Sequence, residues 1–308
     1  MADNYRDWDP EKYLQFEIHR KVAAIKLVKE LKRLVAARWK PDCVIDLGCG
    51  PGTSTKVLES EFPNARIFGI DSSPSMIEAA KTRERAKEAP TTTYMHGNIE
   101  TYVPEDGTDL IFSTEALQYL HADAQIETLQ RLIQNLNPGG VLVFEHADNR
   151  AYDASAAYHE MILTIYKEAA WSQYFKQMRE TERPHWAKIV AEEQYKDALN
   201  PSCSTVRTSR SVAQVILNNH QELVEWMKGA ELRFILKTIT DPDHRKAYLQ
   251  RYMQRLEEVY PRDANGKIVL KWSMLLCVCV KKAEGIEEEG IDEEELDEVD
   301  MIVLPPDC

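Results

Sequence analysis

An apolar run that ends in a glycine-rich turn places the strongest constraint on the fold of this chain. Residues 44–53 read VIDLGCGPGT, and the next apolar run ends at Asp71. This pattern is typical of a strand that passes through a tight turn into a helix, the arrangement by which α/β folds hold a nucleoside cofactor. Gly48, Gly50 and Gly52 have no Cβ, so the backbone can take positive φ and let a ligand approach closely. Asp71 supplies a carboxylate where ribose hydroxyls are expected.

The spacing of the glycines separates two classes of cofactor. Dinucleotide sites use G-x-G-x-x-G, with the pyrophosphate at the amides of a helix N-terminus. Here the third glycine comes one residue early, and Thr53 stands where that pattern has glycine. Asp46 would repel a pyrophosphate, whereas it suits S-adenosylmethionine, which carries an ammonium and a sulfonium. The other interpretation is a turn that binds nothing, but glycines are poor helix formers and seldom gather only to turn a chain.

The net charge of −13 comes almost entirely from one end of the chain. Residues 283–308 hold 12 of the 51 acidic side chains and none of the 38 basic ones. Such a composition favours a solvated, disordered tail. The remaining chain is nearly neutral and has no long basic stripe, so nucleic acid is not an expected partner.

The cysteines and the apolar runs argue against a metal site and against a membrane protein. The six cysteines form no C-x-x-C pair and are not grouped with histidines, so we expect reduced thiols and no metal. No apolar run approaches the roughly 18 residues of a membrane span, and no signal peptide is evident. We therefore expect a soluble cytoplasmic protein. The sequence does not decide its oligomeric state, although a monomer is consistent with it.

Short apolar runs alternate with helical patterns, which predicts βαβ units and a parallel sheet. We expect helices after Thr53 and Pro74, and a third with Asp123 as its N-cap that stops before the Asn-Pro-Gly-Gly cluster at 137–140. Strands are expected at residues 43–47, 66–70, 92–95, 109–113, 141–146 and 274–280, with 204–212 as a partner of the last.

Three further stretches carry helical patterns and are expected to form a cap over the cofactor domain. Residues 10–38 predict one long helical segment, and residues 151–198 and 218–260 interrupt the strand pattern. Insertions at the carboxyl ends of strands are placed to cover a ligand crevice. The expected parts are an N-terminal cap segment (1–39), a cofactor-binding core (40–150), a helical insertion (151–202), the rest of the core with cap helices 218–260 (203–282), and an acidic tail (283–308).

Arginines stand close to aromatic residues in the expected cap. The pairs are Tyr13 with Arg20, Trp226 with Arg233, and Arg251 with Tyr252. Arginine binds carboxylates through a planar, bidentate fork, so this grouping suits an anionic small molecule. The fourth strand is followed by Ser-Thr-Glu-Ala at 113–116, not by the Asn/Asp-Pro-Pro-aromatic signature of methyltransferases that act on the amino groups of bases.

The sequence resembles the bacterial trans-aconitate 2-methyltransferases, a family of class I S-adenosylmethionine-dependent methyltransferases. The resemblance covers about residues 7–282 and is weakest over 153–201. The similar segments are 7–16 (DWDPEKYLQF), 46–52, 69–74 (GIDSSP), 117–120 (LQYL), 148–149, 251–252 and 256–261 (LEEVYP). It implies a Rossmann-like α/β fold with a mostly parallel seven-stranded sheet and a helical cap. It also implies methyl esterification of trans-aconitate or a close relative.

The resemblance also assigns residues to the two ligands. Asp46 and the loop residues Gly48, Cys49, Gly50 and Gly52 are expected to hold the methionine part of the cofactor. Asp71 would bind the ribose, Asn98 and Ile99 would flank the adenine, and Ser72 is expected among the cofactor-binding residues. The acceptor pocket is expected to contain Tyr13, Arg20, Gln118, Tyr119 and Arg233. No side chain is expected to act as a catalytic acid or base, because a carboxylate acceptor with a pKa of about 4 arrives ionised.

Two alternatives remain open from the sequence. A methyltransferase of a small natural-product hydroxyl or amine would need a base, for which His121 and His146 are the candidates. A binding or regulatory protein would keep the cofactor pocket without catalysis and use the acidic tail as its interaction element.

Overall fold

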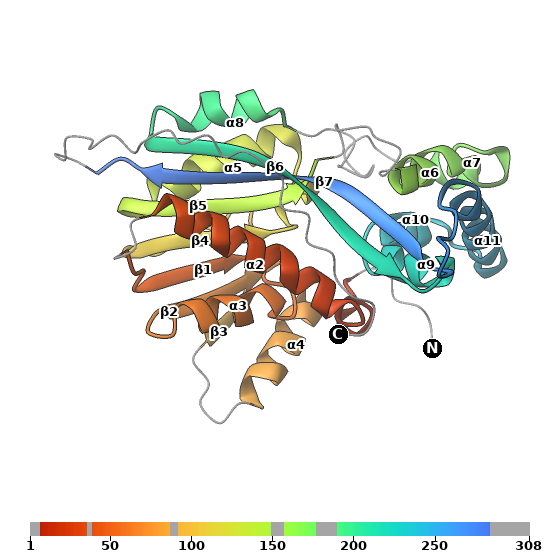
Figure 1. Ribbon diagram of the computed structural model, residues 1–308, viewed down its shortest axis with the longest axis horizontal. Helices are drawn as coiled ribbons and strands as arrows, with labels where there is room; N and C mark the ends of the chain where they lie inside the picture. The colour runs from red at the N-terminus through yellow and green to blue at the C-terminus, as the bar shows by residue number, and fades with distance from the viewer. Residues whose placement is uncertain (1–6, 36–38, 87–91, 149–156, 177–189, 284–308) are drawn as a thin grey trace.

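A single seven-stranded sheet organises the protein, seen in the computed structural model for residues 7–35, 39–86, 92–148, 157–176 and 190–283 (Figure 1). Strands β1 to β5 are parallel, whereas β7 runs antiparallel to both of its neighbours, β5 and β6. The strand order is β3-β2-β1-β4-β5-β7-β6. The strands are β1 (Cys43–Leu47), β2 (Arg66–Asp71), β3 (Thr92–His96), β4 (Thr108–Thr114), β5 (Leu136–Ala147), β6 (Cys203–Leu217) and β7 (Ile268–Lys281).

The predicted fold class and all seven predicted strands are confirmed, but β5, β6 and β7 extend well beyond their predicted bounds. β5 already begins at Leu136, so the Asn-Pro-Gly-Gly cluster that ends the preceding helix lies within the strand, next to a register shift against β4. β6 and β7 continue past the sheet as a two-stranded ribbon that pairs as far as Leu217 with Ile268 and reaches the cap (Figure 1). In the extra length every second residue is buried in the cap core, namely Val215 and Leu217 of β6 and Ile268 and Leu270 of β7.

Helices cover both faces of the sheet. One face packs against α2 and α3 through side chains that include Leu27, Leu31 and Leu58, while α5 and α8 cover the other through Leu129, Leu132 and Tyr195. α4 packs beside β2 and β3. The described helices are α1 (Pro10–Leu14), α2 (Glu17–Leu34), α3 (Thr53–Glu61), α4 (Pro74–Arg85), η1 (Leu117–Tyr119, a 3-10 turn), α5 (Ala122–Gln134), α6 (Ala157–Ile165), α7 (Ala169–Phe175), α8 (Glu192–Leu199), α9 (His220–Lys228), α10 (Leu232–Thr238) and α11 (Pro242–Val259).

A second hydrophobic core lies in the cap at the far end of the β6–β7 ribbon (Figure 1). It joins α6, α7, α9, α10 and α11 to the ends of both ribbon strands, through large side chains such as Tyr248, Tyr252 and Trp171. Tyr248 and Tyr252 are fully buried, and their hydroxyls donate to the carbonyls of Ile162 and Tyr158. The cap is therefore packed as a unit with its own core.

The structure corrects the predicted extent of the cap. α2 and α8 pack on the sheet, so much of residues 1–39 and the end of the 151–202 insertion belong to the core layers. The predicted tail, residues 283–308, lies outside the described part of the chain from residue 284 onward and stays a prediction. Another correction concerns Asp123, because α5 begins at Ala122 after His121 as N-cap. Asp123 instead lies in the first turn of α5, where a negative charge interacts favourably with the helix dipole.

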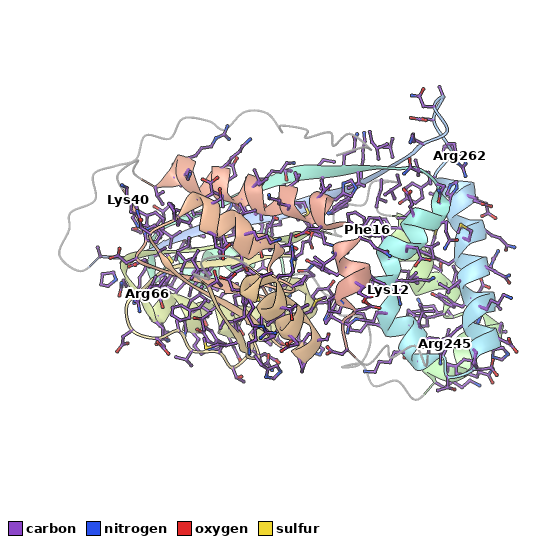
Figure 2. The ribbon with its side chains drawn as sticks, turned by 90° about the horizontal axis from the view of Figure 1, so that it is seen from below. Lys12, Phe16, Lys40, Arg66, Arg245 and Arg262 are labelled. Carbon is purple, nitrogen blue, oxygen red and sulfur yellow. The ribbon has the colours of Figure 1, made fainter. Side chains whose placement is uncertain are left out.

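The predicted long N-terminal helix is interrupted near Phe16, so that α1 and α2 are two separate helices. Phe16 has φ −116° and ψ 27°, and its ring packs 4.9 Å from that of Trp226 in the cap. The segment before it is tied to the core, because Asp7 accepts hydrogen bonds from Ser73 Oγ (2.7 Å) and Ser75 N (3.1 Å) at the start of α4. Lys12 and Phe16 accordingly lie between the sheet and the cap helices (Figure 2).

Because α2 belongs to the core, a cavity in its buried face should destabilise the protein. Leu27 is fully buried between α2 and the sheet. We expect Leu27→Ala to lower the free energy of unfolding by about 2–5 kcal/mol, measured by urea denaturation. Ile18→Ala, at a position of the same helix that is 45% exposed, is the matched control and should change it by about 0.5 kcal/mol or less. Equal losses in the two variants would contradict the placement of α2.

No helix in the described part of the chain is long and apolar enough to cross a membrane.

Candidate active site

A cavity of about 390 Å³ lies between the carboxyl ends of the parallel strands and the cap. It brings together residues from α1, α2, the glycine-rich loop, the end of β4 and the segment that joins α9 to α10. Ten of the predicted site residues line it: Tyr13, Arg20, Gly48, Gly50, Asp71, Ser72, Asn98, Ile99, Tyr119 and Arg233. Four others, Asp46, Cys49, Gly52 and Gln118, are not among its lining residues.

The glycine-rich loop is wedged against the end of β4. The amides of Gly48 and Cys49 both donate to the carbonyl of Ile70, over 2.7 and 3.0 Å. Gly48 has φ +82°, and a Cβ placed on it would lie 2.3 Å from Cβ of Ala116. Only glycine fits this position, because both the backbone angle and the space exclude a side chain.

Asp71 is positioned by the same loop. Its Oδ2 accepts a hydrogen bond from Gly50 N (2.9 Å), and its Oδ1 accepts one from Ser73 N (2.8 Å). Burial raises the pKa of Asp71, and these two amides oppose that shift. A carboxylate has about four acceptor sites, so two bonds leave capacity for a ribose diol at the cavity wall.

Asp46 lies beneath the loop rather than in the cavity. It is fully buried, and its Oδ2 accepts hydrogen bonds from Ser54 Oγ (2.7 Å) and Thr55 Oγ1 (2.5 Å) at the start of α3. These bonds fasten the end of β1 to the start of α3, while Oδ1 of Asp46 has no hydrogen-bond partner, and the place of Asp46 at the methionine part of the cofactor stays a prediction. Cys49 and Gly52 also shape the loop from behind, with the Cys49 thiol packed beside Tyr94.

The buried Asp46 should make stability depend on pH. Burial is the largest cause that raises its pKa from 3.8 to about 6, against the hydrogen bonds from Thr55 and Ser54. The folded state therefore holds this proton more tightly than the unfolded state, and stability is lost as the pH rises from about 4 to about 6. Compared with Asp46→Asn, the wild type should lose roughly 3 kcal/mol over that interval, measured by urea unfolding at each pH. A difference between the two proteins that is constant with pH would contradict the shift.

The residues expected near the adenine lie at the cavity wall. Asn98 Oδ1 accepts a hydrogen bond from Glu100 N (3.0 Å), and the Asn98 carbonyl accepts one from Tyr102 N (2.8 Å). The carbonyl of Ile99 accepts a hydrogen bond from Arg131 Nη2 (3.1 Å). The turn is thus held rigidly from α5, and part of the acceptor capacity of the Asn98 amide is already used.

Arg20 is stacked between two aromatic rings. Its Cζ lies 3.9 Å from the centroid of the Tyr13 ring and 5.1 Å from that of Trp226. Its Nε and Nη2 are buried and have no hydrogen-bond partner. A buried, unpaired guanidinium N–H is costly, so these donors point to an acceptor that binds from the cavity.

Arg233, like Arg20, is packed against two aromatic rings. Its Cζ lies 3.9 Å from the Trp8 centroid and 4.5 Å from that of Phe234, and its buried Nε has no hydrogen-bond partner. Partial burial lowers the pKa of Arg233, against the nearby Tyr119, Asp7, Asp71 and Glu231. The predicted pairing of Trp226 with Arg233 is wrong, since Trp226 lies beside Arg20.

The third predicted pair does not belong to the site. Arg251 Nη2 lies 3.1 Å from Glu168 Oε1 in a partly exposed ion pair, and Arg251 does not line the cavity. Its neighbour Tyr252 is buried in the cap core.

The sequence analysis missed two acidic residues and several aromatic ones at the cavity. Glu115 and Glu231 line it, together with Trp8, Tyr158, Phe234 and Trp272. Gln118, predicted to contact the acceptor, instead donates from Nε2 to Glu115 Oε2 over 2.6 Å. The sequence did carry a signal for Glu115, because this acidic residue directly follows the fourth strand, in the Ser-Thr-Glu-Ala segment at 113–116. Trp8 lies within the similar segment 7–16, but nothing in that segment singled it out.

Comparison with known proteins decides the family. Residues 44–140 match a family model described as a methyltransferase domain. A trans-aconitate 2-methyltransferase of Rhodopseudomonas palustris (strain BisB18) is 33% identical over 275 residues, covering 89% of this chain and 99% of that protein. The chain belongs to the trans-aconitate 2-methyltransferase family.

Other relatives agree with this assignment. The trans-aconitate 2-methyltransferase of Escherichia coli O139:H28 is 34% identical over 272 residues, covering 88% of this chain and 97% of that protein. A solved structure of coclaurine N-methyltransferase shares the fold with a TM-score of 0.51 at 15% identity, covering 85% of this chain and 72% of that one. The protein is therefore an S-adenosylmethionine-dependent methyltransferase, and the non-catalytic alternative is not supported.

The two histidines proposed as bases do not line the cavity. His146 is a buried residue of β5, with Nε2 3.0 Å from Tyr195 Oη and Nδ1 3.0 Å from the carbonyl of Ala147. His121 stands at the N-cap of α5. A base for a hydroxyl acceptor would thus have to be a different residue. Among the described residues, no cluster of three or more His, Cys, Asp or Glu side chains is arranged to hold a metal ion.

Proposed function

We propose that this methyltransferase forms a methyl ester on a carboxylate of a small polycarboxylic acid, with trans-aconitate as the first candidate. The observation that carries the proposal is a pair of half-buried arginines, Arg20 and Arg233, which line the cavity beside the glycine-rich loop and hold buried N–H donors without a partner. Two fixed guanidinium groups match an acceptor with two or more carboxylates. The names of the relatives add independent support for an acid acceptor.

The cavity fits the cofactor as well as the acid. Gly48 and Gly50 leave the loop bare of side chains at the cavity wall, and Asp71 offers acceptors to a ribose. We assign Asn98 and Ile99 to the adenine and Ser72 to the ribose side. When bound, S-adenosylmethionine supplies an electrophilic methyl group and leaves as S-adenosylhomocysteine.

The chain contributes binding, orientation and exclusion of water. Arg20 and Arg233 hold the acid by the carboxylates that do not react, so that the third faces the sulfonium methyl for in-line attack. Tyr13, Tyr119 and Trp8 exclude water, which would otherwise solvate the attacking oxygen and weaken it as a nucleophile. Because the acid is ionised at neutral pH, no proton has to be removed from it.

A methyl-transfer assay against a panel of acids tests the proposal. Trans-aconitate, cis-aconitate, citrate, isocitrate and itaconate are incubated with S-adenosylmethionine, and S-adenosylhomocysteine and the product mass are measured. A strong preference for one polycarboxylic acid supports the proposal. Cofactor binding without turnover of any acid would refute it and favour the natural-product alternative.

A further inference from the structure

Glu115 is a cavity residue to which the proposed reaction assigns no role. It follows the last residue of β4 and adopts φ +50°, the one positive φ among the non-glycine residues that the structure describes. Its amide donates to the carbonyl of Glu145 over 3.0 Å. A side chain in this backbone region costs free energy, and such strain collects at functional sites.

The surroundings of Glu115 determine its protonation state. Burial is the largest cause that raises its pKa to about 7, and the charge of Glu231 adds to it. Arg20, the amide of Ala147 and Gln118 oppose the shift without cancelling it. The titratable groups that face it are Arg20 from α2, Glu231 from the segment between α9 and α10, Glu145 from β5, and Tyr13, Tyr119 and Tyr158.

We propose that Glu115 is a specificity-determining residue: in its protonated form it donates a hydrogen bond to a carboxylate of the bound acid, beside the two arginines. This inference rests on the proposed function. It predicts that the protein binds its acid well when Glu115 is protonated and poorly when it is ionised.

The chemistry of the acceptor favours a donor over a base at this position. An ionised carboxylate has no proton for a base to remove, and an ionised Glu115 would repel it. A protonated carboxyl group has one O–H donor. Gln118 Nε2, 2.6 Å from Glu115 Oε2, is itself a donor and so is no acceptor for that proton. Because Glu115 lines the cavity, its O–H can be donated to a carboxylate that binds there.

The experiment compares wild type with Glu115→Gln, whose amide keeps an N–H donor at every pH. KM and kcat for the best acid are measured at saturating cofactor from about pH 6 to about pH 8.5, a range in which the acid itself stays ionised. At about pH 6 the KM values of the two enzymes should agree within about threefold. At the high end KM of the wild type should exceed that of Glu115→Gln by at least about tenfold, with similar kcat.

Two further variants separate this role from a structural one. Glu231→Gln removes the neighbouring charge, so the rise of KM in that variant should begin at a lower pH than in wild type. Glu78→Gln, at a position with a side chain 67% exposed, is the matched control and should keep the wild-type profile.

Each outcome decides the inference. Identical pH profiles for wild type and Glu115→Gln would overturn it while leaving the proposed function intact. A fall of kcat by about 100-fold or more in Glu115→Gln, at unchanged KM, would overturn it in favour of a general base. Failure of every acid in the panel would overturn the proposed function and this inference together.

Discussion

Replacement of Arg233 by alanine should lower kcat/KM for the best acid by about 100-fold and leave the affinity for S-adenosylmethionine unchanged. The half-buried Arg233 places its guanidinium against the rings of Trp8 and Phe234, and its buried Nε has no hydrogen-bond partner. Truncation of one partner in a desolvated, charged hydrogen bond costs roughly 3 kcal/mol. Steady-state kinetics give the first quantity and calorimetric titration of the cofactor gives the second.

Arg251→Ala is the matched control, because it removes an arginine of the cap that pairs with Glu168 outside the cavity. Its kinetics should equal those of wild type within about twofold. Arg233→Lys should recover only part of the loss, since an ammonium keeps the charge but lacks the planar fork. Normal turnover in Arg233→Ala would remove this residue from the acceptor site.

Replacement of Gly48 by alanine should abolish most cofactor binding, with a loss of affinity of about 100-fold or more. The new Cβ would lie 2.3 Å from Cβ of Ala116, and φ is +82°. The left-handed backbone costs about 1–2 kcal/mol for an L-residue, and overpacking adds about 1–3 kcal/mol. The loop must move away from β4 to relieve the clash, which displaces the wall that receives the cofactor.

Gly107→Ala separates the two causes. Gly107 has φ +90°, but nothing lies within 4 Å of a Cβ placed there. This control should lower the free energy of unfolding by about 1–2 kcal/mol, through strain alone, and leave cofactor affinity unchanged. If Gly48→Ala binds the cofactor as well as Gly107→Ala does, the loop does not form the cofactor wall.

The sequence alone predicted the sheet and the cofactor loop, because both depend on local patterns. Apolar runs of strand length and glycine spacing are readable over a few residues, and all seven strands were found near their predicted places. Positions such as Gly48 and Asp71 could be placed because the strand, the turn and the next strand end are consecutive in the chain. The resemblance added the family, which the comparisons confirm.

Only the tertiary structure decided how the acceptor side is assembled. Arg20 is stacked between Tyr13 and Trp226, which comes from more than two hundred positions later in the chain, so spacing alone paired Trp226 with the wrong arginine. The hydrogen bonds from Ser54 and Thr55 that bury Asp46 at the start of α3 were likewise visible only in the structure. Glu115 shows the physical reason: its pKa is raised to about 7 by burial and by the charge of Glu231, which lies in the cap, and the sequence spacing of residues 115 and 231 could not predict that they lie close together.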